Sequence, residues 1–171
     1  MRLLMKAGLF LMALVVVLLS LSCNVLRAQG VSQPRDATGH ALASEVRPVD
    51  AAIVAIKLNG PVNLTLKQGT VPAMTVRAEP RLLPKIRTMQ QGAALEIDAK
   101  GIMINVRQPM AVELILPALQ QLQVRGSGDS QVSGFSGSAL ELSLVGSGNA
   151  VFNGQYRKIN ARVTGSGNLK L

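Results

Sequence analysis

Side chains that could act together recur in the C-terminal third of the chain, where one short phrase occurs three times. The phrases are Arg-Gly-Ser-Gly-Asp at 125–129, Val-Gly-Ser-Gly-Asn at 145–149 and Thr-Gly-Ser-Gly-Asn at 164–168, so their first glycines lie 20 and then 19 residues apart. A stripe of hydroxyl, carboxylate and amide groups could bind sugar hydroxyls or a cation, and glycine-rich turns can cradle a phosphate. The same residues could instead form a repeated structural corner.

The composition of the phrases argues against the binding interpretations. Asp129 is the only carboxylate in them, whereas a calcium site takes about six to eight oxygen ligands, usually with several carboxylates. The glycines also fail the dinucleotide pattern, because the chain contains no G-x-G-x-x-G and no β-α-β unit is expected around them. We therefore favour a structural role for the phrases, and we predict no metal site and no cofactor.

A corner role explains each residue type in the phrase. Glycine permits positive φ and close approach of a neighbouring backbone, and Asp or Asn can bond to its own backbone at a turn. Because the phrases repeat in register, the serines should stack, and the Asp and Asn side chains should form a ladder of hydrogen bonds. The predicted corner residues are Gly126, Ser127, Gly128, Asp129, Gly146, Ser147, Gly148, Asn149, Gly165, Ser166, Gly167 and Asn168.

Apolar residues around the phrases indicate what these corners connect. When the three copies are aligned on the first glycine, they share apolar positions four and two residues before it and six residues after it. These positions hold Leu122, Leu142 and Ala161, then Val124, Leu144 and Val163, then Val132, Phe152 and Leu171. If each copy closes one coil of a parallel β-solenoid, with coils of about 19 to 20 residues, these side chains stack in columns inside it.

Upstream of the repeats, apolar residues alternate with polar ones in short runs separated by Gly, Pro and Asn, which is typical of strands with one buried face. Such runs occupy residues 56–58, 62–66, 95–97, 102–106 and 112–116. Pro84 interrupts the only stretch that could be helical, residues 80–91, so we interpret 86–89 as a further strand. The sequence thus predicts an all-β domain over residues 45–171.

The acidic residues do not indicate a catalytic site. Glu96, Asp98, Glu113 and Glu141 alternate with apolar residues, so we expect them on a solvated sheet face and not as a catalytic pair. His40, the only histidine, lies in a polar segment and is expected to be a bystander. We predict no catalytic residue. A carbohydrate-active enzyme on a β-helix scaffold is the weaker alternative, because fold analogy alone does not establish an activity.

The N-terminus has the layout of an export signal. Arg2 and Lys6 precede an apolar run at 7–21, and small and polar residues follow. This layout is typical of a secretory signal peptide, here over residues 1–28. An uncleaved membrane-anchor helix is the alternative, although the run is shorter than the roughly 20 residues that a span needs. Cys23, the only cysteine, makes a lipoprotein signal with lipidation at this residue a third alternative.

The segment after the leader lacks the pattern of a folded element, and the chain is basic. Residues 29–44 are polar, contain Gly and Pro and lack periodicity, which indicates a flexible tether. The chain has 18 basic and 9 acidic residues, a net charge of +9, and without the three basic residues of the leader the net charge is +6. This charge favours anionic surfaces such as lipid headgroups or acidic polysaccharide, although a basic surface that only maintains solubility is the plainer interpretation. Nucleic acid is not expected, because aromatic stacking platforms are missing.

Taken together, these residues resemble a bacterial family, the putative auto-transporter adhesin head GIN domain (DUF2807). The chain is similar to this family in its export signal, in the segment 56–69, in a Leu-Pro-x-Leu step at 116–119, and in the Gly-Ser-Gly-Asp/Asn phrases. The similarity extends from about residue 46 to the C-terminus. It implies a right-handed β-solenoid in the bacterial cell envelope, and it supplies no site residues.

We therefore expect a non-enzymatic exported protein, in the periplasm or on the cell surface, that presents a β-solenoid face for binding or adhesion. Its partner would be envelope polysaccharide, an envelope protein or another copy of the chain, with self-association through an unpaired strand edge at 165–171. The N-terminal segment would provide any membrane attachment. A sensing or regulatory partner domain in the envelope is an alternative that the residues neither support nor exclude.

Overall fold

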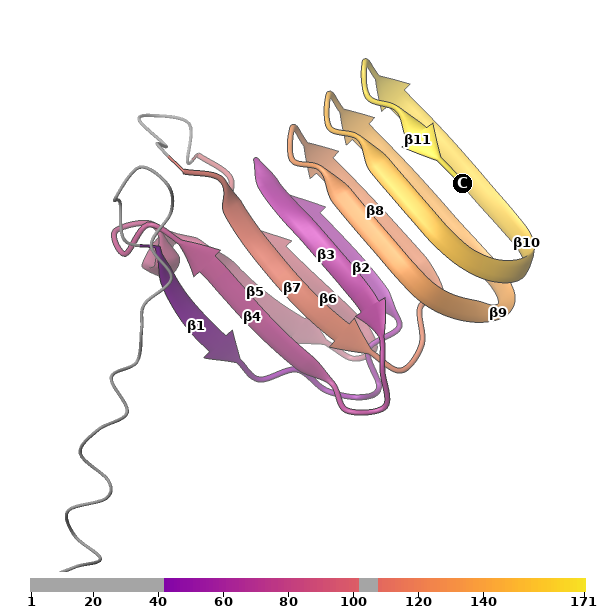
Figure 1. Cartoon of the computed structure of the whole chain (residues 1–171), viewed down its shortest axis with the longest axis horizontal. Coiled ribbons are helices and arrows are strands. Elements are labelled where there is room, and N and C mark those ends of the chain that lie inside the picture. The colour runs from indigo at the N-terminus through magenta and orange to yellow at the C-terminus, as the bar shows by residue number, and fades with distance from the viewer. Residues whose placement is uncertain (1–41, 102–107) are drawn as a thin grey trace, which may run out of the picture. The chain divides into compact units, whose positions relative to one another are not determined.

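The computed structural model in Figure 1 describes residues 42–101 and 108–171. The predictions for the leader at 1–28, for Cys23, for most of the tether at 29–44 and for a strand at 102–106 lie outside these residues. Within the described part of the chain, no helix has the length and the apolar character needed to cross a membrane.

The described chain is all-β, as predicted. Its strands are β1 (Ala43–Arg47), β2 (Ala55–Asn59), β3 (Val62–Gln68), β4 (Ala73–Ala78), β5 (Arg87–Gln91), β6 (Ala94–Asp98), β7 (Met110–Leu116), β8 (Gln121–Gly126), β9 (Ser130–Gly146), β10 (Ala150–Gly165) and β11 (Leu169–Lys170). A short 3-10 helix, η2 (Leu83–Lys85), includes Pro84, and β5 follows it, so the strand predicted at 86–89 is confirmed with a start one residue later. β1 begins before the boundary predicted at residue 45.

The strands form one sheet of 11 strands, which curls until its two halves face each other (Figure 1). Half A contains β1, β4, β7, β3, the first parts of β9 and β10, and β11; half B contains β5, β6, β2, β8 and the second parts of β9 and β10. The long strand β9 joins the halves, because its residues 130–133 pair with β3 whereas its residues 141–146 pair with β8. β10 follows the same path, since it pairs with β9 along both parts.

The sheet is mixed. Parallel pairing joins β8, β9 and β10, and it places Gly126 opposite Gly146 and Gly146 opposite Gly165. Antiparallel pairing joins β1 to β4, β4 to β7 and β5 to β6. The expectation of a parallel arrangement throughout residues 45–171 is therefore wrong for these three pairings. One physical reason is the tight turn at Gly92, where a φ of +56° reverses the chain and makes β5 and β6 a hairpin. In the same part of the chain, β2 pairs in parallel with β6 and β8, and β3 pairs in parallel with β7 and β9.

The core lies between the two halves of the sheet, where inward-facing residues pack in columns. The strand registers place the predicted columns side by side, with Leu122 beside Leu142 and Ala161, Val124 beside Leu144 and Val163, and Val132 beside Phe152. Two of these columns continue upstream through Ile56 and Leu58 of β2. Most members are buried, but Val163 is 41% exposed and Leu171 is 61% exposed. The columns therefore lose their burial toward the C-terminal strands.

Candidate functional site

The three phrases lie at the turns that follow β8, β9 and β10, and their backbones are in close contact. Gly126, Gly146 and Gly165 have φ values of +146°, +133° and +118°, a region that favours glycine. A Cβ atom on Gly146 would overlap the carbonyl oxygen of Gly126, and one on Gly165 would overlap that of Gly146. Neither turn could therefore hold a larger residue at this place without a shift of the backbone.

The second glycine of each phrase is restricted by the same kind of contact. A Cβ atom on Gly128 would overlap the carbonyl oxygen of Val62, one on Gly148 would overlap that of Gly128, and one on Gly167 would overlap that of Gly148. Backbone hydrogen bonds also join successive turns, since the Ser166 amide donates to the Gly146 carbonyl at 3.0 Å. Two columns of glycine thus run through the turns, and the serines between them are exposed.

Side chains at the fourth place of each phrase are joined by hydrogen bonds. The backbone amide and the Nδ2 atom of Asn149 both donate to Oδ1 of Asp129, at 2.9 and 3.1 Å. Nδ2 of Asn168 donates to Oδ1 of Asn149 at 3.1 Å. Asp129, Asn149 and Asn168 are all exposed. These bonds form a ladder at the surface, where water competes for the same groups.

Sequence inspection missed the fourth member of this ladder, Asn63. The backbone amide of Asp129 donates to Oδ1 of Asn63 at 3.0 Å. Asn63 follows Gly60 by three residues, as Asp129 follows Gly126, and Gly60 has a φ of +113°. The turn between β2 and β3 therefore aligns with the phrases, although Pro61 and Val62 replace their serine and second glycine. Spacing from glycine to Asn was the signal that could have revealed it.

The carboxylates do not converge on one centre. Glu113 forms an ion pair with Arg77 at 3.0 Å, Asp98 approaches Arg87 at 3.6 Å, and Oε1 of Glu96 accepts a hydrogen bond from Nδ2 of Asn59 at 3.0 Å. Across residues 42–101 and 108–171, no group of three or more His, Cys, Asp and Glu side chains could hold a metal ion. These three carboxylates therefore interact with separate partners and do not form one cluster.

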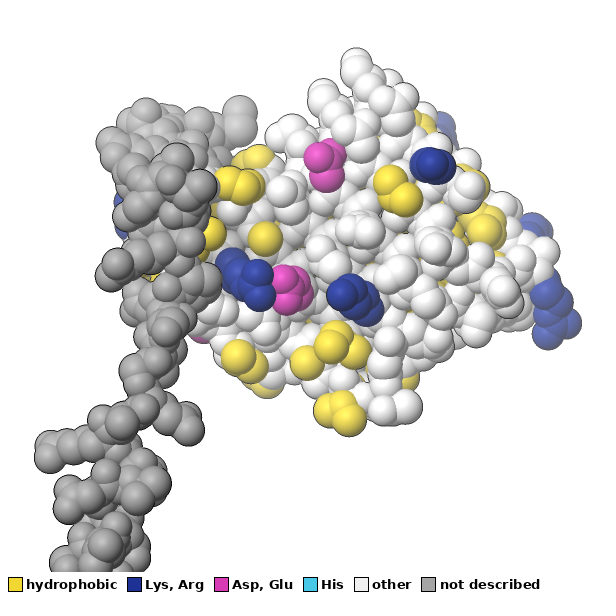
Figure 2. Space-filling view, in the orientation of Figure 1, with side chains coloured by type: hydrophobic (Ala, Val, Ile, Leu, Met, Phe, Trp, Pro, Cys, Tyr) yellow, Lys and Arg dark blue, Asp and Glu magenta, His cyan; other side chains and the backbone are white. Residues whose placement is uncertain are grey.

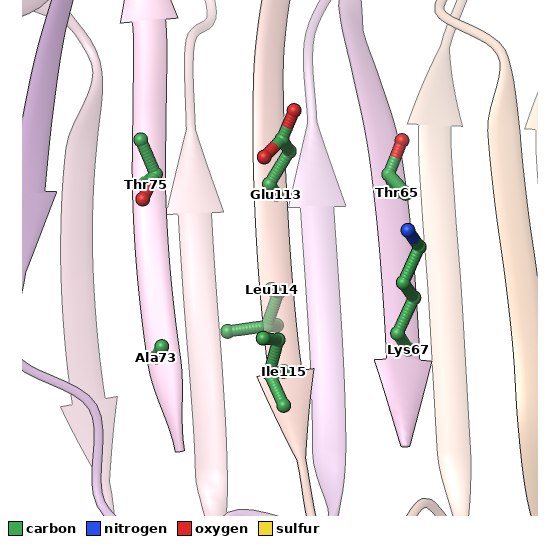
Figure 3. A pocket seen from close by; sticks show the side chains of 7 residues that line it. All are labelled: Thr65, Lys67, Ala73, Thr75, Glu113, Leu114 and Ile115. Carbon is green, nitrogen blue, oxygen red and sulfur yellow. The ribbon is translucent and has the colours of Figure 1, made fainter. Parts of the chain in front are cut away.

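An open groove crosses the outer face of half A (Figure 3). It is lined by Thr65, Lys67, Ala73, Thr75, Glu113, Leu114 and Ile115 from β3, β4 and β7. Glu113 lies opposite Thr75 on one neighbouring strand and opposite Thr65 on the other, and Thr65 lies opposite Gln131 of β9. Together with Gln131 beside the groove, these residues form a cross-strand row of hydroxyl, carboxylate, hydroxyl and amide groups, which can both donate and accept hydrogen bonds.

A second groove lies beside the ladder on the same face, so the polar surface continues toward the phrases. Its lining includes Asn63, Thr65, Asp129, Gln131 and Asn149. Thr65 belongs to both grooves. The structure therefore brings Asp129 and Asn149 of the predicted corner residues next to the outward row, whereas the glycines of the phrases contact neighbouring backbone.

Tyr156 fastens β10 to a distant turn, and nothing in its sequence context indicates this. Its hydroxyl donates to the Leu119 carbonyl at 2.6 Å, its ring centroid lies 5.9 Å from that of Phe152, and a Cβ atom on Gly137 would lie 2.8 Å from the ring. Burial raises the pKa of the Tyr156 hydroxyl above its usual value of 10.0. The neutral phenol therefore serves as a structural hydrogen-bond donor from β10 to the turn between β7 and β8.

Solved structures with similar folds are described as adhesins and as a lipid-binding protein. A putative adhesin from Bacteroides fragilis has a TM-score of 0.70 and 19% identity, over 76% of this chain and 62% of its own. A putative adhesin from Parabacteroides distasonis has a TM-score of 0.60 and 21% identity, over 75% and 63%. A putative lipid binding protein from Parabacteroides distasonis has a TM-score of 0.60 and 20% identity, over 74% and 56%.

These likenesses establish the fold alone, and the chain spans about three fifths of the length of each of these structures. No curated protein matches the chain. A family model does match, over residues 54–171, and its description is putative auto-transporter adhesin, head GIN domain. That range includes the groove, the ladder and all three phrases, and it covers more than half of the sequence. This chain therefore belongs to the family described as putative auto-transporter adhesin, head GIN domain.

Proposed function

We propose that this protein is exported to a bacterial cell envelope, where the outer face of half A binds an envelope polysaccharide without catalysis. Membership of an adhesin family supports a surface role. The observation that carries the proposal is the row formed by Thr75, Glu113, Thr65 and Gln131, whose side chains stand on one outward face at the spacing of neighbouring strands. A polymer that bears hydroxyl groups could form hydrogen bonds with several members of this row at once.

The phrases have a different role in this proposal. We propose that their glycines and their Asp and Asn residues form the corners of the fold, and that the strands around them form the right-handed parallel solenoid expected from the sequence. The support is the parallel register of β8, β9 and β10 and the close contact between successive turns. The corners then keep the strands of half A in line, and the outward row does the binding.

A glycan array probed with the protein tests the binding face. We expect Thr65→Val combined with Glu113→Gln to remove binding, because the first substitution deletes a hydroxyl and the second replaces a charged acceptor oxygen with an amide donor. The matched control is Thr164→Val combined with Glu141→Gln, since these exposed residues carry the same two changes in half B. Equal binding by both double variants would contradict the proposed face, and capture of an envelope protein without any glycan would favour a protein partner.

The same purified protein tests the enzyme alternative. Cleavage of an acidic polysaccharide by a lyase would release unsaturated product, and it would need a base close to groups that stabilise negative charge. The ion pairs and hydrogen bonds of Glu113, Asp98 and Glu96 support a non-enzymatic role. Product release from any of a panel of acidic polysaccharides would overturn it. A sensing or regulatory role is the remaining alternative, and it would appear as capture of an envelope signalling protein.

Export is a separate part of the proposal. We propose that residues 1–28 direct export and that the segment predicted at 29–44 acts as a tether as far as the start of β1 at Ala43, with lipidation at Cys23 and a retained membrane anchor as the alternatives. The mass of the mature N-terminus distinguishes cleavage after Ala28, lipid attachment and retention. Self-association through 165–171 is an alternative to glycan binding, and its support is that β11 covers only residues 150 and 151 of the adjacent edge of β10. A monomer at every concentration in sedimentation would remove it.

A further inference from the structure

Positive charge is concentrated in the C-terminal segment, defined here as residues 150–171. This segment contains four basic residues and no acidic one: Arg157, Lys158, Arg162 and Lys170. The other described residues contain nine Lys or Arg and eight Asp or Glu, so they are nearly neutral as a group. The basic character of the folded domain thus comes mainly from one short stretch, and Figure 2 shows Lys and Arg side chains at the end of the domain that carries β10 and β11.

These four cations are exposed and have no ion pair within the described chain. Elsewhere the acids Glu45, Glu79, Asp98 and Glu113 each pair with a neighbouring arginine. The cations are distributed over both halves of the sheet. Lys170 belongs to β11 in half A, and Arg162 belongs to the part of β10 in half B. A partner that spans the edge at β10 and β11, such as a flat surface, would meet cations of both halves, whereas a polymer lying along one face would meet those of one half only.

Exposed apolar side chains lie in the same segment. Val151 is 44% exposed, Val163 is 41% exposed and Leu171 is 61% exposed. Val151 lies directly opposite Lys170 in the register of β10 and β11. Apolar side chains next to cations suit the boundary between lipid headgroups and acyl chains, where the cations meet anionic headgroups and the apolar groups leave water.

We propose that the C-terminal segment docks the domain on an anionic phospholipid surface. This inference rests on the proposed export of the protein, which would place the domain beside a membrane. Docking through residues 150–171 leaves the groove over β4, β7 and β3 open. The two surfaces adjoin at Val151, which lies opposite Gln131 at the end of the outward row. Attraction of this kind weakens when salt screens it.

Fluorescence of a single tryptophan tests the proposal, because the chain contains no tryptophan. The probe variant is Leu171→Trp in the full chain, mixed with vesicles of phosphatidylcholine alone or with added phosphatidylglycerol. We expect a blue shift only with phosphatidylglycerol, and a smaller one at high salt. The shift reports the surroundings of residue 171, so attachment through the N-terminal segment alone does not produce it.

Two triple variants on the probe background separate local charge from net charge. Arg157→Gln, Lys158→Gln and Arg162→Gln should raise the lipid concentration needed for half the shift by on the order of 100-fold, at about fivefold for each cation. The control replaces Lys57, Lys85 and Lys100 by Gln, which removes the same charge from exposed sites elsewhere. The control should bind lipid much as the probe variant does.

Four outcomes would overturn the proposal. Two concern lipid: no fluorescence shift with phosphatidylglycerol, and an equal loss of lipid binding in both triple variants. The third is binding of a soluble acidic polysaccharide through these cations without any shift on lipid. The fourth is a shift that rises with protein concentration in the absence of vesicles, which would indicate a second copy. Export is measured independently by cell fractionation. An exported protein that ignores anionic vesicles would refute the docking proposal alone, whereas retention in the cytoplasm would refute the proposed function.

Discussion

Replacing Asn149 by alanine removes the centre of the hydrogen-bonded ladder. The side chain of Asn149 donates to Asp129 at 3.1 Å and accepts a hydrogen bond from Asn168 at 3.1 Å, so both bonds are lost. The backbone amide of residue 149 keeps its bond to the carboxylate, because that bond does not need the asparagine side chain. The substitution therefore tests the two side-chain bonds while the turn keeps its glycines.

The expected loss follows from the number and the exposure of these bonds. A typical intramolecular hydrogen bond contributes about 0.5–1.5 kcal/mol net, and a charged partner increases this. Because all three side chains are exposed, water replaces part of the lost interaction. We expect the free energy of unfolding to fall by about 1–2 kcal/mol. For a domain of this size, that corresponds to a drop in Tm on the order of 3–8 °C.

Urea unfolding of Asn149→Ala measures this loss, with Ser147→Ala as the control in the same turn. Ser147 is exposed, so its replacement should change stability by less than about 0.5 kcal/mol. A double-mutant cycle with Asn168→Ala should give a coupling energy of roughly 0.5–1 kcal/mol, because the two residues are in contact. Strict additivity together with unchanged stability would refute the ladder. A loss above about 3 kcal/mol would contradict its exposed position.

Three further substitutions test other parts of the fold by the same unfolding measurement. Gly146→Ala should lower the free energy of unfolding by more than about 2 kcal/mol, because φ is +133° and the new Cβ atom would overlap the Gly126 carbonyl. The control Gly92→Ala should lose less stability, because Gly92 has a φ of +56° but no atom within 4 Å of the new Cβ atom. Equal losses in the two variants would contradict the close contact at Gly146. Ser130→Ala should be neutral or raise stability by about 1 kcal/mol, because the Ser130 hydroxyl is buried without a partner and the residue opposite it, Ala150, is already an alanine. A clear loss of stability would indicate an unrecognised hydrogen bond. Tyr156→Phe should lower stability by about 1 kcal/mol through loss of the bond to Leu119. Burial raises the pKa of Tyr156 above 10.0 in the folded protein. The contribution of Tyr156 to the free energy of unfolding is therefore present below pH 10 and is lost as the pH rises through the folded-state pKa. The wild type should lose this contribution at alkaline pH, and Tyr156→Phe should not.

Features that repeat locally are the ones that the sequence pattern can reach. Gly126, Gly146 and Gly165 lie at successive turns with positive φ, and the apolar residues before them lie side by side, because parallel strands of nearly equal length bring equivalent residues together. Pro84 correctly excluded a long helix and indicated a strand after it. The exposure of Val163 was not predicted, because the alignment of apolar positions says nothing about what covers β10.

Features that depend on pairing between distant segments could not be read from these patterns. Strand β4 pairs antiparallel with β7, more than 30 residues later, and an alternating pattern is the same for both directions of pairing. The contact from Tyr156 to Leu119 also spans 37 residues and has no local signature. Asn63 was missed because its turn keeps only one glycine of the phrase. The outward row around Glu113 likewise exists only through strand order.

Binding to a glycan array by two variants tests most directly whether the phrases build the fold and the outer face of half A binds the ligand. One variant replaces Ser127, Ser147 and Ser166 by alanine, which removes every serine hydroxyl from the phrases. The other combines Thr65→Val with Glu113→Gln. The account predicts that the serine variant binds like the wild type and that the double variant loses binding while it remains folded. Loss of binding in the serine variant and retention in the double variant would contradict it.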